Sequence, residues 1–349
     1  MSRSARKVDH INHALLTGQA LSHGFEDVKF VHNSIPEINV DEINLSSKIG
    51  ELTLSSPIFI NAMTGGGGKE TTKINQQLAE VAAETDIAMA VGSQMAAIKD
   101  KEQQPSYTIV RKVNPKGMVI ANLGSEASID QARQAVEMLE ANAFQLHVNV
   151  IQELVMPEGD RNYAGTFKRI EELVHKLEVP VIVKEVGFGM SQETIKRLAA
   201  IGVEMVDIGG FGGTNFSKIE NKRRDRQLRF FDNWGIPTTA SLLEVHHANT
   251  CIDVLASGGM QTALDLAKSL ALGARAGGFA GYFLKILKED GQEALINEIT
   301  DLKEDLTMIL TALDVKSPHD LTKVPLVFSG ETYQWACQRG IDIQSISTR

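Results

Sequence analysis

Short runs of apolar residues alternate with longer amphipathic stretches along most of the chain. Eight runs are typical of β-strands: PIFIN near residue 58, IAMAV from 87, MVIAN from 118, FQLHV from 144, VIVK from 181, EMVDI from 204, IDVLA from 252 and RAGGFA from 275. Stretches between them, such as INQQLAEVAAET and IDQARQAVEMLEA, place apolar residues at the i, i+3, i+4 spacing of helices. Eight strand–helix units in succession predict a closed parallel (β/α)8 barrel of the TIM type. An open doubly wound sheet is the alternative, because periodicity gives the order of elements but not their closure.

Two segments fall outside the eight predicted units. Residues 1–57 form an N-terminal arm, 58–290 form the barrel core, and 291–349 form a helical extension with an extended end. The interval 209–237 is too long for an ordinary strand–helix connection and is rich in glycine and charge, which is typical of a functional or mobile loop. Because no low-complexity linker interrupts the chain, we expect residues 1–349 to form a single domain.

Charge and cysteine content exclude several functional classes for this protein. The 349 residues include 35 Lys and Arg against 44 Asp and Glu, a net charge of −9, which argues against nucleic-acid and membrane-surface binding. Any anionic ligand must therefore be captured locally. Cys251 and Cys337 are far apart and form no CxxC motif, so neither a disulfide framework nor a zinc cluster is indicated. With no apolar targeting segment at the start, we expect a cytoplasmic protein.

Polar and glycine-rich residues follow the predicted strands, where barrels of this type build their active sites. They include Met63 and Thr64 before GGGG, then Ser93, Asn122, Lys184 with Glu185, and GGFGGTN. The last two strands end in SGGM (257–260) and FAGYF (279–283). Glycine at these two ends lets backbone N–H groups approach a phosphate, whereas either loop alone could serve as a tight turn. Both loops together favour a phosphate-bearing ligand.

The stretch HVNVIQELVMPEGDR (147–161) follows the fourth predicted strand. Strand geometry directs His147 and Asn149 to the barrel mouth, with Gln152 and Glu153 in the loop above. A lone histidine is more often a satisfied core residue, but four hydrogen-bonding side chains within seven residues favour a ligand site. Glu153 is the only acid among the four and is the natural ligand for Mg²⁺.

Two groups of basic residues are candidate anion partners. Lys184 ends the buried run VPVIVKEVG and could be a Schiff-base nucleophile, a cation for a bound anion or half of a structural ion pair. The N-terminal RSARKVDHI brings together Arg3, Arg6, Lys7 and His10. This terminus is either simply solvated or a clamp over the mouth in which Arg6 and Lys7 pair with phosphate oxygens.

These motifs resemble those of a known enzyme family. RKVDHI, NAMTGG, VGSQ, ANLG, HVNVIQELVMPEGDR, VKEVGFG, GGTNF, SGGM and GFAGYF resemble, in this order, the type 2 isopentenyl-diphosphate isomerases, which depend on FMN. The resemblance implies a (β/α)8 barrel in which reduced flavin serves as the acid/base cofactor that interconverts isopentenyl and dimethylallyl diphosphate. It also implies Mg²⁺, NADPH or a similar donor to reduce the flavin, and assembly as a homo-oligomer, a tetramer or an octamer.

The resemblance assigns roles to individual residues. It implies flavin contacts from Ala62, Met63, Thr64, Ser93, Asn122, Lys184 and Thr214, and flavin-phosphate contacts from Gly258, Gly259, Ala280 and Gly281. The implied substrate residues are Arg6, Lys7, His10, His147, Asn149 and Gln152, and Glu153 would bind Mg²⁺. His147, Lys184 and Gln152 are the candidate catalytic residues: Lys184 would balance the charge of reduced flavin and Gln152 would orient the allylic end of the substrate. Gly209 departs from the family, in which many members have serine, and this affects one expected flavin hydrogen bond.

Two other functions fit the same barrel. One is an FMN-dependent oxidoreductase of the hydroxy-acid oxidase or dihydroorotate dehydrogenase type, which would carry out a net two-electron oxidation without Mg²⁺. The other is a flavin- or phosphate-binding module without catalysis, which would leave the cluster from His147 to Glu153 unexplained.

Overall fold

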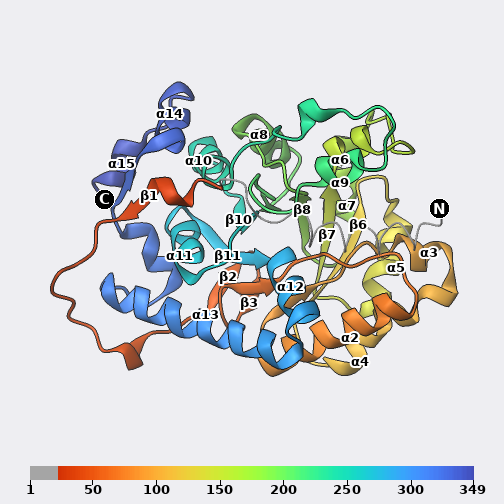
Figure 1. Ribbon diagram of the computed structural model, residues 1–349, viewed down its shortest axis with the longest axis horizontal. Helices are drawn as coiled ribbons and strands as arrows, with labels where there is room; N and C mark the ends of the chain where they lie inside the picture. Colours follow the sequence, from red (N-terminus) through yellow and green to blue (C-terminus); the bar gives the residue numbers. More distant parts are fainter. Residues whose placement is uncertain (1–22) are drawn as a thin grey trace.

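The computed structural model describes residues 23–349 and contains a closed parallel β-barrel (Figure 1). The strands follow each other around the barrel in the order β10-β11-β4-β5-β6-β7-β8-β9. Their bounds are β4 (Ile58–Ile60), β5 (Ala88–Ala90), β6 (Val119–Gly124), β7 (Ala143–Val148), β8 (Val181–Glu185), β9 (Met205–Asp207), β10 (Asp253–Ser257) and β11 (Ala274–Phe279). Each of the eight predicted runs overlaps one of these strands. The predicted closed barrel is therefore confirmed, and the open sheet is excluded.

Helices surround the barrel, and several begin at clear capping signals. They are α2 (Lys69–Glu84), α3 (Met95–Lys99), α4 (Pro105–Val113), α5 (Ile129–Leu139), α7 (Thr166–Lys176), α8 (Gln192–Ala200), α10 (Thr238–Ala248), α11 (Ala263–Ala271) and α12 (Gly281–Glu289). Ser128 and Gln131 form a capping box at the start of α5, as Thr262 and Asp265 do at α11. Such boxes satisfy N–H groups that the helix itself cannot pair, and thereby fix where each helix begins.

The lumen of the barrel is apolar at its N-terminal end. Phe59, Ile120, Ile182, Met205 and Leu255 are all nearly inaccessible there and pack together. The antiparallel hairpin of β2 (Ser47–Ile49) and β3 (Leu52–Leu54) closes this end with Ile49, Leu52 and Leu54. Full burial of each such side chain contributes about 1.5–3 kcal/mol, so this end of the barrel is a packed core.

Polar side chains replace the apolar ones two residues further along the strands. Strand side chains alternate between the two faces, so a residue at i+2 faces the lumen like the residue at i. The next lumen positions are Asn61, Asn122, Gln145, Lys184, Asp207 and Ser257, all at most 7% exposed. The C-terminal end of the barrel is thus a buried polar layer, and the candidate site lies above it.

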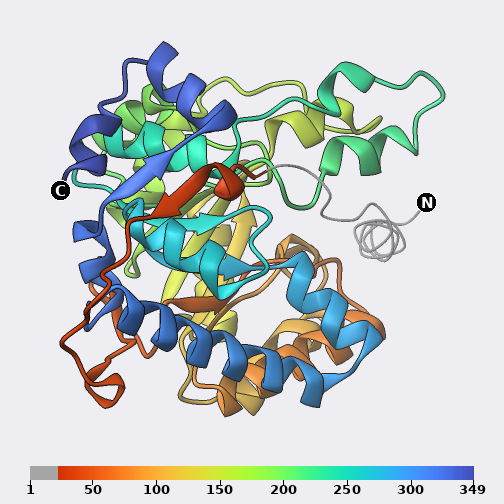
Figure 2. The same ribbon diagram turned by 60° about the vertical axis from the view of Figure 1, so that its left-hand side comes forward.

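The segments at the two ends of the chain pack together outside the barrel. After the turn η1 (Phe25–Asp27), β1 (Val28–Phe30) pairs antiparallel with β12 (Leu326–Phe328), seen in red and blue in Figure 2. The remaining elements are η2 (Val40–Glu42), α13 (Gln292–Ala312), η5 (Pro318–Lys323), α14 (Gly330–Gln338) and α15 (Ile343–Ser347). The expected extended end is wrong, because α15 occupies it. Within residues 23–349, no helix is both long and apolar enough to cross a membrane.

Two segments that were expected to be loops contain helices. Gln152 and Glu153 lie on α6 (Val150–Val155), which ends just before Pro157, a residue that cannot continue a helix. The interval 209–237 contains α9 (Phe216–Asn221) and the 3-10 turn η4 (Arg229–Phe231). A further 3-10 turn, η3 (Lys101–Gln103), links α3 to α4. Gln152 and Glu153 are therefore held on a helix and not on a free loop.

Candidate active site

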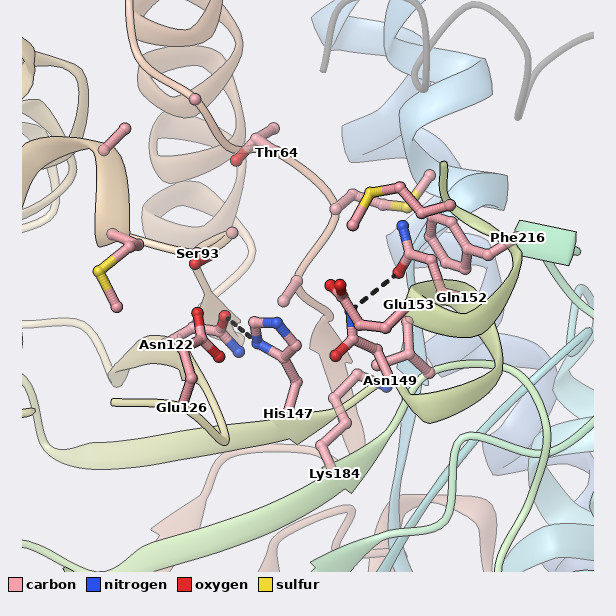
Figure 3. A pocket seen from close by; sticks show the side chains of 18 residues that line it. Thr64, Ser93, Asn122, Glu126, His147, Asn149, Gln152, Glu153, Lys184 and Phe216 are labelled. Carbon is pink, nitrogen blue, oxygen red and sulfur yellow. Dashed lines mark hydrogen bonds between the residues drawn. The ribbon is translucent and has the colours of Figure 1, made fainter. Parts of the chain in front are cut away.

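Two adjoining cavities open at the C-terminal end of the barrel. The first is lined by residues from the ends of β4 to β8 and from α6, including Thr64, Ser93, Asn122, Glu126, His147, Asn149, Gln152 and Glu153 (Figure 3). The second is lined mainly by glycine-rich loops and includes Gly209, Gly210, Gly213, Thr214, Ser257, Gly258, Gly259, Gly278, Ala280 and Gly281. Both share Ala62, Met63, Lys184, Val186 and Phe216. Every predicted flavin, metal and substrate position within the described residues lines one or the other cavity.

The second cavity fits a phosphate group. The backbone of Gly258 has φ +121°, and a Cβ there would lie 2.1 Å from the carbonyl oxygen of Gly210. A Cβ on Gly213 would lie 2.8 Å from the backbone nitrogen of Gly259, so side chains would fill this cradle. Helix α12 begins after Ala280, and no side chain among the described residues caps it, whereas Thr262 caps α11. The uncapped N–H groups of α12 are suited to an anion.

Gly209 is required by its own backbone conformation. Its φ is +47°, and a Cβ would lie 2.0 Å from the carbonyl oxygen of Glu185. A serine would clash with β8 in this conformation. Gly209, which departs from the family, therefore stands at a position where the local backbone accommodates only glycine.

Lys184 lies in the floor shared by the two cavities and is paired. Its Nζ lies 3.2 Å from Asp207 Oδ2 and donates to the carbonyl oxygen of Glu185 at 2.9 Å and to Ser257 Oγ at 3.3 Å. Asp207 is fully buried and also accepts from Ser257 Oγ at 2.5 Å. Of the three interpretations of Lys184, the ion pair is present. The same ammonium group lines both cavities, so a role toward a bound anion stays a prediction.

A hydrogen-bonded cluster joins Asn149, which directly precedes α6, to Gln152 and Glu153 on α6. Asn149 Nδ2 donates to Gln152 Oε1 at 3.3 Å and to Glu153 Oε1 at 3.0 Å. Glu153 Oε2 accepts from the backbone N–H of Asp160 at 2.8 Å. In the same cavity, His147 Nδ1 lies 3.0 Å from Asn122 Oδ1 (Figure 3). The four predicted side chains, from His147 to Glu153, thus line one cavity.

Sequence reasoning missed Glu220, which supports this cluster. Glu220 is fully buried on α9, and its Oε1 accepts from Gln152 Nε2 at 3.3 Å. Arg223 Nη1 lies 2.5 Å from the other carboxylate oxygen and Arg223 Nη2 lies 2.6 Å from Glu158. Glu220 stands in the charged run KIENKRRDR, where nothing in the spacing separates a buried acid from solvated ones. The interaction between α6 and α9 is visible only in the folded chain.

The metal and basic-arm predictions remain open. No group of three or more His, Cys, Asp or Glu side chains suited to a metal occurs within residues 23–349. Glu153 as a single carboxylate is compatible with Mg²⁺, which takes one or two carboxylates together with substrate phosphates. Arg3, Arg6, Lys7 and His10 lie outside the described residues.

Glu185 should make stability fall with rising pH. Burial raises the pKa of its carboxyl to about 8, although the backbone N–H of Phe188 and the Lys184 ammonium favour the charged form. Between the ordinary value of 4.5 and about 8, the folded protein holds a proton that the unfolded chain has lost. We expect Glu185 to contribute a decrease of up to about 1.4 kcal/mol per pH unit in this window.

The Glu185→Gln variant tests this expectation. A glutamine keeps an oxygen that accepts from the N–H groups of Phe188 and Gly189, but it does not titrate. The free energy of unfolding is measured by urea denaturation between pH 5 and pH 9 for both proteins. The difference between them should change with pH across the window. Parallel profiles would show that Glu185 is charged in the folded protein.

Comparisons with known proteins place the chain in a family. The model of the FMN-dependent dehydrogenase family matches residues 110–327. The chain is 58% identical to an isopentenyl-diphosphate delta-isomerase of Bacillus licheniformis over 98% of each chain, and 58% identical to one of Bacillus cytotoxicus over the full length of both. Among solved structures, mandelate oxidase (a mutant with (S)-mandelic acid) aligns with a TM-score of 0.68 at 16% identity, covering 93% of this chain and 94% of that one. A flavocytochrome b2 mutant aligns with a TM-score of 0.67 at 19% identity, covering 93% and 80%. The chain therefore belongs to the FMN-dependent dehydrogenase family and, within it, to the isopentenyl-diphosphate delta-isomerases.

Proposed function

We propose that the protein interconverts isopentenyl diphosphate and dimethylallyl diphosphate with FMN as its cofactor. The observation that carries this proposal is the full-length similarity to isomerases at 58% identity. The site adds support, because a polar pocket built by His147, Asn149, Gln152 and Glu153 adjoins a glycine-lined cavity that fits a phosphate. Each residue role given below is part of the proposal.

The cofactor is proposed to lie across the floor shared by the two cavities. Gly258, Gly259, Ala280 and Gly281 would hold its phosphate, and Ala62, Met63, Thr64, Ser93, Asn122, Lys184 and Thr214 would contact the rest of it. When bound and reduced, the flavin supplies the proton transfer that moves the double bond. The chain's own share is to position the groups, exclude water and balance charge, with Lys184 as the nearest cation.

The substrate carries a diphosphate, and the described lining does little to neutralise it. Among the lining residues within 23–349, Lys184 is the one lysine or arginine, and it is already paired with Asp207. Glu126 and Glu153 add negative charge. Positive charge must therefore come from elsewhere, which supports Mg²⁺ at Glu153 and a contribution from His147.

The basic N-terminal residues are the second proposed source of positive charge. His23, the first described residue, lies against the phosphate loops: its carbonyl oxygen accepts from Thr239 N, and a Cβ on Gly259 would lie 3.0 Å from its ring. His10 precedes His23 by 13 residues and Arg6 by 17 (23 − 10 and 23 − 6). An extended chain spans about 3.3–3.6 Å per residue, so Arg6, Lys7 and His10 are within reach of the mouth.

Three finer features of this function concern the reductant, the assembly and the cellular location. NADPH as the reductant and assembly into a tetramer or octamer follow from the resemblance to type 2 isomerases. A cytoplasmic location is supported by Cys251 and Cys337, which are both free and exposed, as expected in a reducing compartment.

The competing function is an FMN-dependent oxidation of a hydroxy acid or a dihydroorotate-like substrate. The similarity of the fold to mandelate oxidase and flavocytochrome b2 favours it, but at 16–19% identity this similarity concerns the fold alone. An oxidation changes the redox state of the substrate, whereas an isomerisation does not. The two functions therefore differ in whether reductant is consumed in proportion to product.

Product analysis tests the proposed function. The purified protein is incubated with isopentenyl diphosphate, FMN, NADPH and Mg²⁺, and the product is identified by NMR and mass spectrometry. We expect dimethylallyl diphosphate, with far less NADPH oxidised than product formed. A second incubation replaces isopentenyl diphosphate with a hydroxy acid. Unchanged isopentenyl diphosphate in the first incubation and flavin-dependent oxidation of the hydroxy acid in the second would support the oxidoreductase instead.

The Glu153→Gln variant should need much more Mg²⁺ for the same rate. Glutamine keeps the shape of the side chain and can still accept from Asn149 and from the backbone N–H of Asp160. It removes the charge that would hold the metal. The isomerisation rate is titrated with Mg²⁺ for both proteins. An unchanged titration curve would remove Glu153 from the metal site.

A further inference from the structure

A continuous chain of buried hydrogen bonds connects Lys184 with His147 through the polar layer of the barrel. Asp207 pairs with Lys184 at 3.2 Å and accepts from Asn61 Nδ2 at 2.7 Å. Gln145 Nε2 donates to Asn61 Oδ1 at 3.4 Å, and Asn122 Nδ2 donates to Gln145 Oε1 at 3.0 Å. His147 Nδ1 then lies 3.0 Å from Asn122 Oδ1. Asn61, Asn122, Gln145 and Asp207 are at most 2% exposed.

The direction of this chain is fixed at the Asn61 end. Asn61 Oδ1 accepts from the backbone N–H of Ala62 at 2.8 Å, and a backbone nitrogen can only donate. Its Nδ2 therefore faces the carboxylate of Asp207. If Asn61 were flipped, its amide hydrogens would meet the N–H of Ala62 and its oxygen would meet a carboxylate oxygen. The orientation of the first amide thus follows from two partners that have no alternative form.

The remaining amides follow one after another. Because Asn61 Oδ1 is an acceptor, the nearest atom of Gln145 must be its nitrogen, which leaves Gln145 Oε1 facing Asn122. Asn122 therefore turns its nitrogen to Gln145 and its oxygen to His147. An amide oxygen can only accept, so His147 Nδ1 must carry the hydrogen. In the neutral ring, Nε2 is then the nitrogen without a hydrogen.

We propose that Asp207 is a positioning residue that sets two features of the site at once: the placement of the Lys184 ammonium, and, through Asn61, Gln145 and Asn122, the Nδ1–H tautomer of His147. Asp207 touches neither proposed ligand itself. It acts through Lys184 on one side and through the three amides on the other. The part of Asp207 in catalysis rests on the proposed function. The tautomer of His147 follows from the hydrogen bonds alone.

The two branches respond differently to substitution. Asp207→Asn removes the counter-charge of Lys184 and places an amide where a carboxylate accepts from Asn61, Ser257 and the backbone N–H of Gly209. Both branches should change. Gln145→Leu breaks only the amide chain and leaves the pair of Lys184 and Asp207 in place. Only the His147 branch should change.

Nitrogen NMR on the full-length protein labelled with ¹⁵N-histidine measures the tautomer of His147. The signals of His147 are identified by their loss in His147→Gln, and the other eight of the nine histidines serve as internal references. In the wild-type protein, without substrate, we expect His147 to carry its proton on Nδ1 when neutral. In Gln145→Leu and in Asp207→Asn, we expect the Nε2–H form to appear.

The midpoint potential of bound FMN measures the effect of Asp207 on the Lys184 ammonium. Removing the negative charge beside Lys184 leaves its positive charge uncompensated, which favours the more negative, reduced flavin. Asp207→Asn should therefore shift the potential to a more positive value, whereas Gln145→Leu, which leaves the charges of Lys184 and Asp207 in place, should shift it much less. A general structural defect would shift the potential by similar amounts in both variants.

The outcomes separate this inference from the proposed function. A wild-type His147 protonated on Nε2, a tautomer unchanged in both variants, or an unshifted potential in Asp207→Asn would overturn the role of Asp207. The wild-type tautomer decides alone if the variants do not fold. A protein that shows the expected tautomers but forms no dimethylallyl diphosphate would overturn the isomerase function and leave the role of Asp207 toward His147 standing.

Discussion

The Lys184→Ala variant is expected to bind FMN weakly and to unfold more readily than the wild-type protein. Removing the ammonium leaves the carboxylate of Asp207 buried without its cation, at 0% exposure. Breaking one side of a buried ion pair typically costs about 3–5 kcal/mol. It also removes the one lysine or arginine among the described residues that line the two cavities. Urea denaturation measures the first effect, and flavin absorbance after gel filtration measures the second.

A double variant separates stability from flavin binding. Lys184→Met combined with Asp207→Asn removes both charges and keeps side chains of similar size, so much of the lost stability should return. Retention and reduction of FMN should stay impaired, because the cation is still missing. If Lys184→Ala keeps full activity and reduces its flavin normally, Lys184 is a structural ion-pair residue and has no role toward the cofactor.

The order of the strands and the closed barrel were predictable, but the contacts between side chains inside the barrel were not. The side chains of each predicted strand run alternate between two faces, and the folded barrel shows the same alternation. Asp207, Asn61 and Gln145 stand inside the runs EMVDI, PIFIN and FQLHV, where each looks like an isolated polar exception. Their partners come from segments far apart in sequence: Asn61 directly follows β4 and Asp207 ends β9, and the two side chains meet only across the closed lumen.

The site was predictable where single motifs carried it. The 147–161 stretch and the two glycine loops pointed to the residues that line the cavities, because each group is contiguous in sequence. Helix α6 was missed because six residues are too few for a clear helical period, and the turn residues after Met156 suggested a loop. Glu220 was missed because its burial depends on packing of α9 against α6, about 70 residues away in sequence.

The amide of Gln152 is held from both sides. Asn149 Nδ2 donates to its oxygen at 3.3 Å, and its nitrogen donates to the buried Glu220 at 3.3 Å. Glu220 in turn is fixed by Arg223, which also contacts Glu158. Because its oxygen meets a donor and its nitrogen meets an acceptor, the amide of Gln152 has a defined orientation at the mouth of the barrel. Such a side chain is suited to orienting a reacting group and is not a strong base.

Gln152→Ala is expected to fold, to retain FMN and to accept electrons from NADPH, yet to lose isomerase turnover by on the order of a hundredfold. A misplacement of about 1 Å at a reacting centre has an effect of this size, and alanine leaves the allylic end of the substrate without its orienting amide. The proposed flavin-phosphate contacts lie on other loops, after β10 and β11, so cofactor content should not change. His147→Ala is the matched comparison: loss of a phosphate partner should mainly raise KM, with kcat less affected. Steady-state kinetics and flavin absorbance measure these effects. A colourless or insoluble Gln152→Ala protein would show that Gln152 serves the cofactor or the fold and not the substrate.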